Sequence, residues 1–114
     1  MLVKKFRLKR KRDFEQVIKK GKHLRENFLI LKILKNDLML VRVGFVVGKK
    51  ISKKATVRNK IKRRLREAVR TYITKIKAGY DLVFLAEKGI EEKSFYEIKK
   101  VVEYLLGKIK VLKK

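Results

Sequence analysis

Several residue types are absent or scarce in this chain of 114 residues, and each absence narrows what it can do. Without cysteine it can form no disulfide, no zinc–thiolate site and no cysteine nucleophile. Its longest uncharged apolar run is far shorter than the ~20 residues that a transmembrane helix needs. Residues 1–6 hold no apolar signal-peptide segment. These absences are compatible with the cytosol, so we expect a cytoplasmic protein without a membrane partner.

Acidic side chains are also scarce. The chain has 35 Lys and Arg against 11 Asp and Glu, which gives a formal net charge of +24, and its pI is about 10.6. A net charge magnitude of roughly 2–8 keeps a small domain in solution, so solubility explains little of this excess. Neutralising phosphates releases counterions and drives binding, so nucleic acid is the expected partner. A membrane-surface helix or a calmodulin target is the lesser alternative.

The positive charge is unevenly distributed along the chain. Residues 1–25 carry 11 basic and 2 acidic side chains, and residues 49–70 carry 11 basic and 1 acidic. Residues 81–104 carry 4 basic and 6 acidic side chains. The first two segments are therefore predicted to form the binding surface, whereas the third should lie on the structural side, away from the polyanion.

The most basic segment, residues 54–70, also has the apolar spacing of an α-helix. Its apolar residues and those that follow recur every three or four positions and form one stripe: Val57, Ile61, Leu65, Ala68, Tyr72 and Ile76. The opposite face presents Arg58, Asn59, Lys62, Arg63, Arg66 and Arg70. Like charges at i and i+4 destabilise a helix by roughly 0.2–0.5 kcal/mol per pair. A helix that tolerates such a row is predicted to meet a polyanion there.

The rest of the chain alternates helix and strand patterns in an α+β order. The expected elements are an extended segment at 1–12, a helix at 13–20, strands at 28–34 and 40–47, a helix at 55–77, a strand at 81–86 and a helix from 94 onward. Asp13 can begin the first helix and Gly21 can end it. Ser94 can cap the last helix, with Glu97 placed for a capping box.

Groups that could cleave a phosphodiester are scarce in the basic segments. His23 is the only histidine, and we interpret it as a surface residue or a contact to nucleic acid rather than a general base. Asp13 and Glu15 lie two apart on a short helix and so point in different directions. Glu67 is placed to pair with an arginine one turn before or after it. Two-metal hydrolysis needs converging carboxylates, so a stand-alone nuclease is disfavoured.

The basic helix contains an ordered motif, Arg58-Asn59-Lys60-Ile61-Lys62-Arg63, with Arg66-Glu67 after it and with Lys49-Lys50 and Ala55 before it. This motif resembles the signature helix of one known family, the bacterial ribonuclease P protein subunit. Its other motifs are matched in order by Arg7-Leu8, Asp13-Phe14, Gly21, Arg42-Val43-Gly44-Phe45-Val46-Val47 and Gly79-Tyr80-Asp81. The resemblance covers nearly the whole chain.

The resemblance implies a particular fold. It is an α+β fold in one small domain over residues 1–114, with the order α-β-β-β-α-β-α and a mixed sheet. The β-α-β crossover at the signature helix is expected to be left-handed. Right-handed crossovers are the default, so reasoning from the residues alone would predict the opposite hand. The family pattern also implies a short strand near residues 22–26, which the residues alone do not indicate.

The resemblance also implies a function. Such a protein is the RNA-binding, accessory subunit of an endoribonuclease that removes the 5′ leader from precursor tRNA. Catalysis is expected from an RNA subunit, with Mg²⁺ held mainly by that RNA, so no catalytic residue and no protein metal site is predicted. The implied partners are the catalytic RNA and precursor tRNA, with no obligatory protein partner. The alternative is a structural RNA-binding protein of the ribosomal type, which shares size and charge but not the ordered motifs.

Two RNA-binding surfaces follow from the resemblance. The catalytic RNA is expected to contact Arg58, Asn59, Lys60, Lys62, Arg63 and Arg66. Lys60 stands where many members have arginine, so its charge persists without the bidentate fork. Lys49 and Lys50 open the loop before the helix and are expected to touch phosphate; a solvated lysine run is the alternative.

The second surface is a cleft between the first helix and the sheet, which is expected to receive the single-stranded leader. Its residues here are Phe14, Ile18 and Lys32. Single strands bind through aromatic platforms and basic grooves. Other members often carry aromatics at the positions of Ile18 and Lys32, so we expect stacking to contribute less here and charge more. For Phe14 core packing is the alternative, and Phe28, Phe45 and Phe84 are interpreted as core.

Overall fold

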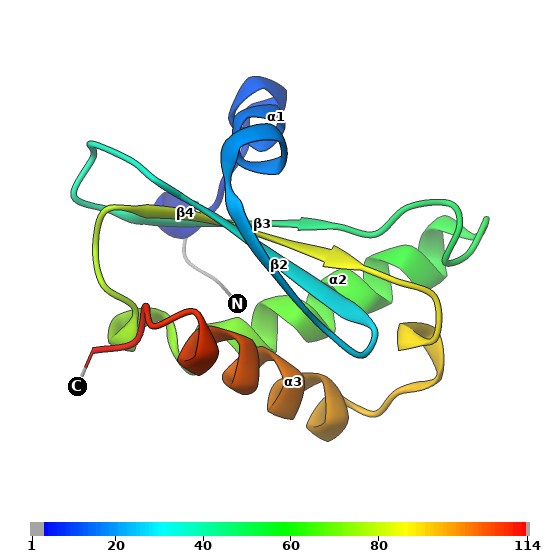
Figure 1. Cartoon of the computed structure of the whole chain (residues 1–114). Helices are drawn as coiled ribbons and strands as arrows, with labels where there is room; N and C mark the ends of the chain where they lie inside the picture. Colours follow the sequence, from blue (N-terminus) through cyan, green and yellow to red (C-terminus); the bar gives the residue numbers. More distant parts are fainter. Residues whose placement is uncertain (1–3, 114) are drawn as a thin grey trace.

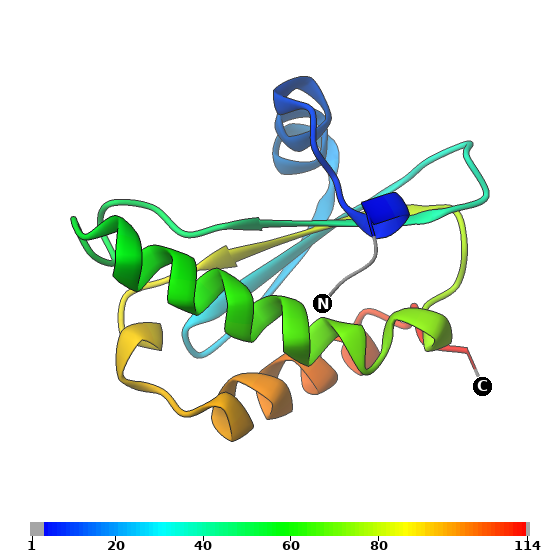
Figure 2. The ribbon, with the colours of Figure 1, turned by 180° about the vertical axis from the view of Figure 1, so that it is seen from behind.

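A four-stranded mixed sheet separates two layers of helices (Figure 1). The computed structural model describes residues 4–113. One face of the sheet carries α1 (Lys11–Lys20), and the other carries α2 (Ala55–Arg70) and α3 (Phe95–Lys108), side by side (Figure 2). The strands are β1 (Lys22–Glu26), β2 (Leu29–Lys35), β3 (Val41–Val46) and β4 (Tyr80–Ala86). Three short 3-10 helices are η1 (Lys4–Phe6), η2 (Ile73–Lys75) and η3 (Ile90–Glu92).

The strands lie in the order β1-β2-β4-β3. β2 pairs antiparallel with both β1 and β4, whereas β3 pairs parallel with β4. The chain leaves β3, returns through α2 beneath the sheet and enters β4; in Figure 1, with β3 behind β4, this path has the left-handed sense that the resemblance implied. The α-β-β-β-α-β-α order and the mixed sheet confirm the predicted fold class.

The predicted boundaries hold better for strands than for helices. Both boundaries of each strand predicted from apolar patterns lie within one residue of those observed for β2, β3 and β4. β1 spans residues 22–26, as the resemblance implied. The first helix begins at Lys11, two residues before the prediction. The basic helix was predicted to run to residue 77 and ends at Arg70. There the Tyr72 N–H bonds the Val69 carbonyl at 2.8 Å, a tighter turn that breaks the α-helical pattern.

The N-terminal segment is not simply extended as predicted. Residues 1–3 lie outside the described part of the chain. Lys4–Phe6 form the short helix η1, and Arg7 then forms a parallel bridge with Val43. The Leu8 N–H donates to the Val43 carbonyl at 2.9 Å. The segment before α1 is therefore attached to the outer edge of β3, which covers part of an otherwise unpaired strand edge.

Two hydrophobic cores lie on opposite faces of the sheet. The larger fills the space between the sheet and the pair α2 and α3, and its fully buried members include Leu31, Leu65, Leu82, Phe84, Ile98 and Leu105. The smaller lies under α1 and is built on Leu8, Val17 and Val83. Because one ten-residue helix is the only helix packed on this face among residues 4–113, α1 covers only part of it.

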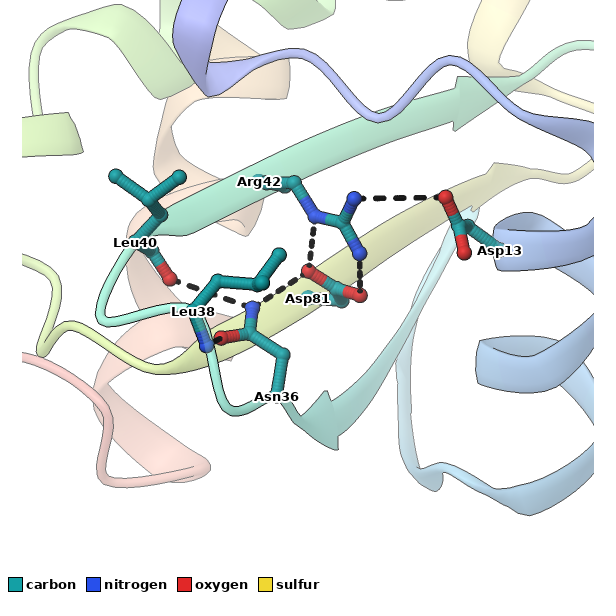
Figure 3. A network of polar contacts seen from close by, with 6 residues as sticks. All are labelled: Asp13, Asn36, Leu38, Leu40, Arg42 and Asp81. Carbon is teal, nitrogen blue, oxygen red and sulfur yellow. Dashed lines mark hydrogen bonds and ion pairs between the residues drawn. The ribbon is translucent and has the colours of Figure 1, made fainter.

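A polar network holds α1 and the β2–β3 turn to the sheet (Figure 3). Asp81 is 5% exposed and accepts two hydrogen bonds from Arg42, from Nε at 2.8 Å and from Nη2 at 2.7 Å. Asn36 donates to the same carboxylate at 2.7 Å, and Arg42 Nη1 reaches Asp13 Oδ2 of α1 at 3.4 Å. The hydrogen bonds from Arg42 to Asp81 raise the pKa of the guanidinium, so it stays charged.

We expect Asp81→Ala to destabilise the fold, because it leaves the partly buried Arg42 guanidinium without its principal partner. The free energy of unfolding should fall by about 3 kcal/mol, near the lower bound for breaking a buried pair because Arg42 keeps some solvent contact. Chemical denaturation measures this. The control is Asp37→Ala, which removes an exposed carboxylate in the β2–β3 turn and should change stability by less than about 0.5 kcal/mol. Equal losses in the two variants would contradict the role assigned to Asp81.

Candidate nucleic-acid interface

The two faces of α2 differ sharply in character. Its buried residues are Ile61, Leu65, Ala68 and Val69. The predicted stripe is therefore buried, with Val57 packed against the same core and Tyr72 and Ile76 buried beyond the end of the helix. The exposed residues include Asn59, Lys60, Arg63 and Arg70. Packing thus fixes the outward direction of the basic residues, and the two flanks of the helix have different neighbours.

Lys62 and Arg66 lie on the flank of α2 that faces the outer edge of β3. A groove of about 190 Å³, here called the β3-edge groove, is lined by Arg7, Leu8, Phe14, Val43, Gly44, Phe45, Lys62 and Arg66. Three of these side chains are cations and none is acidic. The groove brings the predicted RNA-binding helix together with Phe14, the aromatic predicted for the leader cleft, although the two lie on opposite faces of the sheet.

Phe14 packs directly on the backbone of β3. Gly44 makes this possible: a Cβ at that position would lie 2.3 Å from Cε1 and Cζ of the Phe14 ring. The ring is half-buried, packs against the smaller core and also lines the β3-edge groove. Phe14 therefore combines a packing contact with an accessible side, which borders the groove that Arg66 also lines.

Ile18 and Lys32 are brought together as the resemblance implied. Lys32 Nζ donates a hydrogen bond of 2.8 Å to the Ile18 carbonyl near the end of α1. The carbonyl end of a helix carries partial negative charge, which favours a cation there. An ammonium group has three donors, so Lys32 keeps donors for other partners while it holds α1 to β2.

The face of the sheet beside α1 stays partly open. In register across the strands, Arg25, Ile30, Leu85 and Val46 form one row. Ile30, Leu85 and Val46 are half-buried, and the exposed Arg25 pairs with Glu87 at 3.1 Å. These four residues are called the open sheet face. Together with Phe14 and Lys32 they give the predicted cleft an apolar floor with basic margins.

Arg58 turns back toward the loop that precedes α2. Its Nη1 donates to the carbonyls of Ser52 and Lys53 at 3.0 and 2.9 Å. Lys49 and Lys50 are exposed in the turn that opens this loop. Arg58 therefore holds in place the loop between β3 and α2, which also contains Lys49 and Lys50.

The other flank of α2 faces α3. A hollow of about 370 Å³, here called the α2–α3 hollow, is lined by Lys60, Arg63, Arg64, Glu67 and Phe95. Glu67 pairs with Arg70 at 3.2 Å, as one of the two predicted partners. Phe95 belongs to residues 81–104, which were expected to lie on the structural side, yet it lines this hollow together with basic residues of α2. The amphipathic α3 packs beside α2, and this packing places Phe95 next to the basic residues of α2.

Carboxylates near these surfaces are occupied by basic partners. Asp13 and Asp81 both bind Arg42, and Glu67 binds Arg70. Among residues 4–113 no group of three or more His, Asp or Glu side chains is placed to hold a metal ion. These carboxylates are therefore engaged in ion pairs within the chain, and the Mg²⁺ that the resemblance implies was expected mainly on the RNA. Within the same residues no helix is long and apolar enough to cross a membrane.

Sequence reasoning did not select Arg7 or Phe45 for the site. Arg7 lines the β3-edge groove because its segment pairs with Val43, a contact that no local pattern indicates. Phe45 was interpreted as core; it stacks on Phe84 with ring centroids 5.8 Å apart and also lines the groove. The alternation along β3 predicts that Phe45 faces the large core, but not that the strand lies at the sheet edge.

Comparison with known proteins is consistent with this arrangement. The chain matches the family model described as Ribonuclease P over residues 2–110. The ribonuclease P protein component of Alkaliphilus oremlandii is 38% identical over 106 residues, which cover 93% of this chain and 92% of the relative. That of Syntrophomonas wolfei is 42% identical over 100 residues, which cover 88% of this chain and 83% of the relative.

Solved structures give the same result. The RNase P protein of Staphylococcus aureus superposes with a TM-score of 0.86 at 29% identity, covering 94% of this chain and 97% of that protein. The RNase P protein of Thermotoga maritima, in complex with 1-(4-fluorophenyl)-2-thiourea, has a TM-score of 0.77 at 35% identity. That match covers 87% of this chain and 96% of the other.

Gly44→Ala should displace the Phe14 ring from β3, because the new methyl group overlaps the ring. Overpacking of this kind costs roughly 1–3 kcal/mol, and the melting temperature should fall accordingly. Gly48→Ala is the matched control, since a Cβ there meets nothing within 4 Å. Aromatic NMR signals of Phe14 should shift in the first variant and not in the second. Unchanged Phe14 signals in Gly44→Ala would show that the ring does not rest on β3.

Proposed function

Because this chain belongs to the ribonuclease P protein family, we propose that it binds a catalytic RNA through α2 and the 5′ leader of precursor tRNA along α1 and the sheet. The β3-edge groove carries this proposal. It places two cations of α2 and the aromatic ring of α1 on one continuous surface. An RNA bound to α2 and a single strand in the cleft would then meet at the outer edge of β3.

The contact with the catalytic RNA rests on charge and geometry. Asn59 is exposed on α2, Lys62 and Arg66 line the β3-edge groove, and Lys60 and Arg63 line the α2–α3 hollow. Arginine can grip a phosphate with two parallel hydrogen bonds, whereas lysine acts as a point charge. Lys49 and Lys50 extend the positive surface beyond the start of the helix. Arg58 positions this loop and takes part in the surface through its remaining donors.

The leader contact rests on the open sheet face. Its half-buried Ile30, Val46 and Leu85 offer apolar area to bases, and Phe14 offers a ring at the border. Lys32 and Arg25 lie in the same region, within reach of a backbone that crosses the strands. One ring is fewer than a typical single-strand platform uses, so electrostatic contacts carry much of the affinity in this proposal.

The hydrolysis itself is assigned to the RNA subunit, with Mg²⁺ held by that RNA. The supporting observation is that Asp13, Asp81 and Glu67 already bind arginines of this chain. This chain then contributes affinity and orientation. Its partners in this proposal are the catalytic RNA and precursor tRNA, and no second protein is required.

Lys62→Ala and Arg66→Ala should each weaken binding to a bacterial ribonuclease P RNA. Each removed phosphate contact should also reduce the slope of log affinity against log salt concentration by about one. Filter binding at several salt concentrations measures both quantities. Lys108→Ala serves as the control, since this exposed lysine lies at the far end of α3 and should leave the slope unchanged.

The same preparations test the division of labour. Protein alone should leave precursor tRNA intact, and addition of the RNA subunit should restore cleavage at the 5′ leader, more weakly for the two α2 variants at low magnesium. Cleavage by rigorously purified protein without RNA would refute the proposal. So would salt slopes that are identical for the wild type, Lys62→Ala and Arg66→Ala.

Phe14→Leu should selectively weaken binding of precursor tRNA that carries a leader. Leucine preserves most of the apolar contact with Gly44 but removes the stacking surface, which is worth roughly 1–3 kcal/mol per stacked base. The affinity of the assembled RNA–protein enzyme for leaderless mature tRNA should stay the same. Tyr96→Leu is the control, an exposed ring on α3 far from the cleft. Equal weakening toward both tRNAs, with a lowered melting temperature, would assign Phe14 to packing alone.

A further inference from the structure

Phe95 is a large apolar side chain that the fold leaves accessible beside basic residues. It is 39% exposed and lines the α2–α3 hollow together with Lys60 and Arg63. Neither core cluster includes it, although it begins a helix whose aliphatic residues are buried. Exposure of an aromatic ring next to two cations is the arrangement that single-stranded nucleic acids use for stacking and phosphate contact.

Two sets of local hydrogen bonds fix the backbone at Phe95. It is the first residue of α3, directly after Ser94, whose hydroxyl accepts the Glu97 N–H at 3.2 Å while Glu97 accepts the Ser94 N–H at 3.1 Å. This capping box fixes the backbone at the start of the helix. Arg64 of α2 then donates to the Lys93 carbonyl at 3.0 Å, which holds the same segment against α2. Because its backbone is already held, Phe95 loses less conformational entropy when a base stacks on its ring.

The charges around the hollow favour an anionic ligand. Its lining contains three cations, Lys60, Arg63 and Arg64, and one carboxylate, Glu67, which is paired with Arg70. Arg64 is engaged with the Lys93 carbonyl, so Lys60 and Arg63 are the residues available for phosphate. Both are exposed on α2, on the side away from the β3-edge groove.

We propose that the α2–α3 hollow binds an unpaired base of the catalytic RNA, stacked on Phe95, with the adjoining phosphates contacted by Lys60 and Arg63. This site rests on the proposed function and extends it from α2 to α3. The RNA surface then spans α2 on both flanks, with Phe14 on one side and Phe95 on the other. The ligand is the catalytic RNA rather than the leader, because α2 separates the hollow from the open sheet face.

A tryptophan reporter tests the stacking directly, because the chain contains no tryptophan. Phe95→Trp places a single indole in the hollow, and a stacked base should quench its fluorescence when the bacterial ribonuclease P RNA is added. Tyr96→Trp is the matched control, one residue along, 63% exposed and outside the hollow. Quenching should saturate with the RNA in the first variant and stay small in the second. Precursor tRNA alone should quench neither; if it quenches Phe95→Trp as strongly, the assignment to the catalytic RNA is wrong.

Binding constants supply the second measurement. Phe95→Ala should weaken binding to the ribonuclease P RNA roughly 5- to 150-fold, the range expected for loss of one stacked base. Phe95→Tyr, which keeps the ring, should bind like the wild type, and Tyr96→Ala should lose little. If Phe95→Ala unfolds, Phe95→Leu replaces it, since leucine keeps apolar volume without a ring. Unchanged affinity in the folded, ring-less variant, or absence of quenching in Phe95→Trp, overturns the proposal.

The outcomes separate this site from the proposed function. If the wild-type protein binds the RNA with the salt slope expected for α2, and Phe95→Ala binds equally well, only the Phe95 site is refuted. Wild-type protein that fails to bind the RNA refutes the proposed function and this site with it.

Discussion

The burial of one side of α2 beneath the sheet is the constraint on which the rest of the structure depends. Three large side chains, Ile61, Leu65 and Val69, are almost fully buried there. Each contributes roughly 1.5–3 kcal/mol, whereas repulsion within the row of cations costs only about 0.2–0.5 kcal/mol per pair. Burial therefore outweighs repulsion, and the helix can carry a dense positive charge without leaving the domain.

That orientation gives α2 two flanks with different surroundings. Toward the outer edge of β3, Lys62 and Arg66 meet the segment that precedes α1 and the ring of Phe14. Toward α3, Lys60 and Arg63 meet Phe95. The connection from β3 to β4 places α2 on the face of the sheet opposite α1, where its Lys62 and Arg66 reach the groove at the outer edge of β3. The basic side chains of α2 therefore line one hollow with residues of α1 and β3, and another with the first residue of α3.

The few acidic residues act mainly as structural partners. Asp81 and Asp13 hold Arg42, Glu87 pairs with Arg25, and Glu97 closes the capping box of α3. Each carboxylate neutralises or orients a group that positions an element. The remaining excess of lysine and arginine is then left on the surface, where it raises the local potential that attracts a polyanion.

The sequence by itself determined the features that depend on neighbouring residues. The stripe from Val57 to Ile76, the Ser94 capping box, the boundaries of three strands and the excess of positive charge all follow from local spacing and composition. The ordered motifs around Arg58-Asn59 were specific enough to indicate the family. Only the tertiary structure decided that Arg66 and Phe14 line one groove, that Arg42 binds Asp81 and that Phe95 shares a hollow with residues of α2. These contacts join residues that are distant in sequence. They depend on the order of the strands and on the path of the crossover, and no local sequence pattern encodes either.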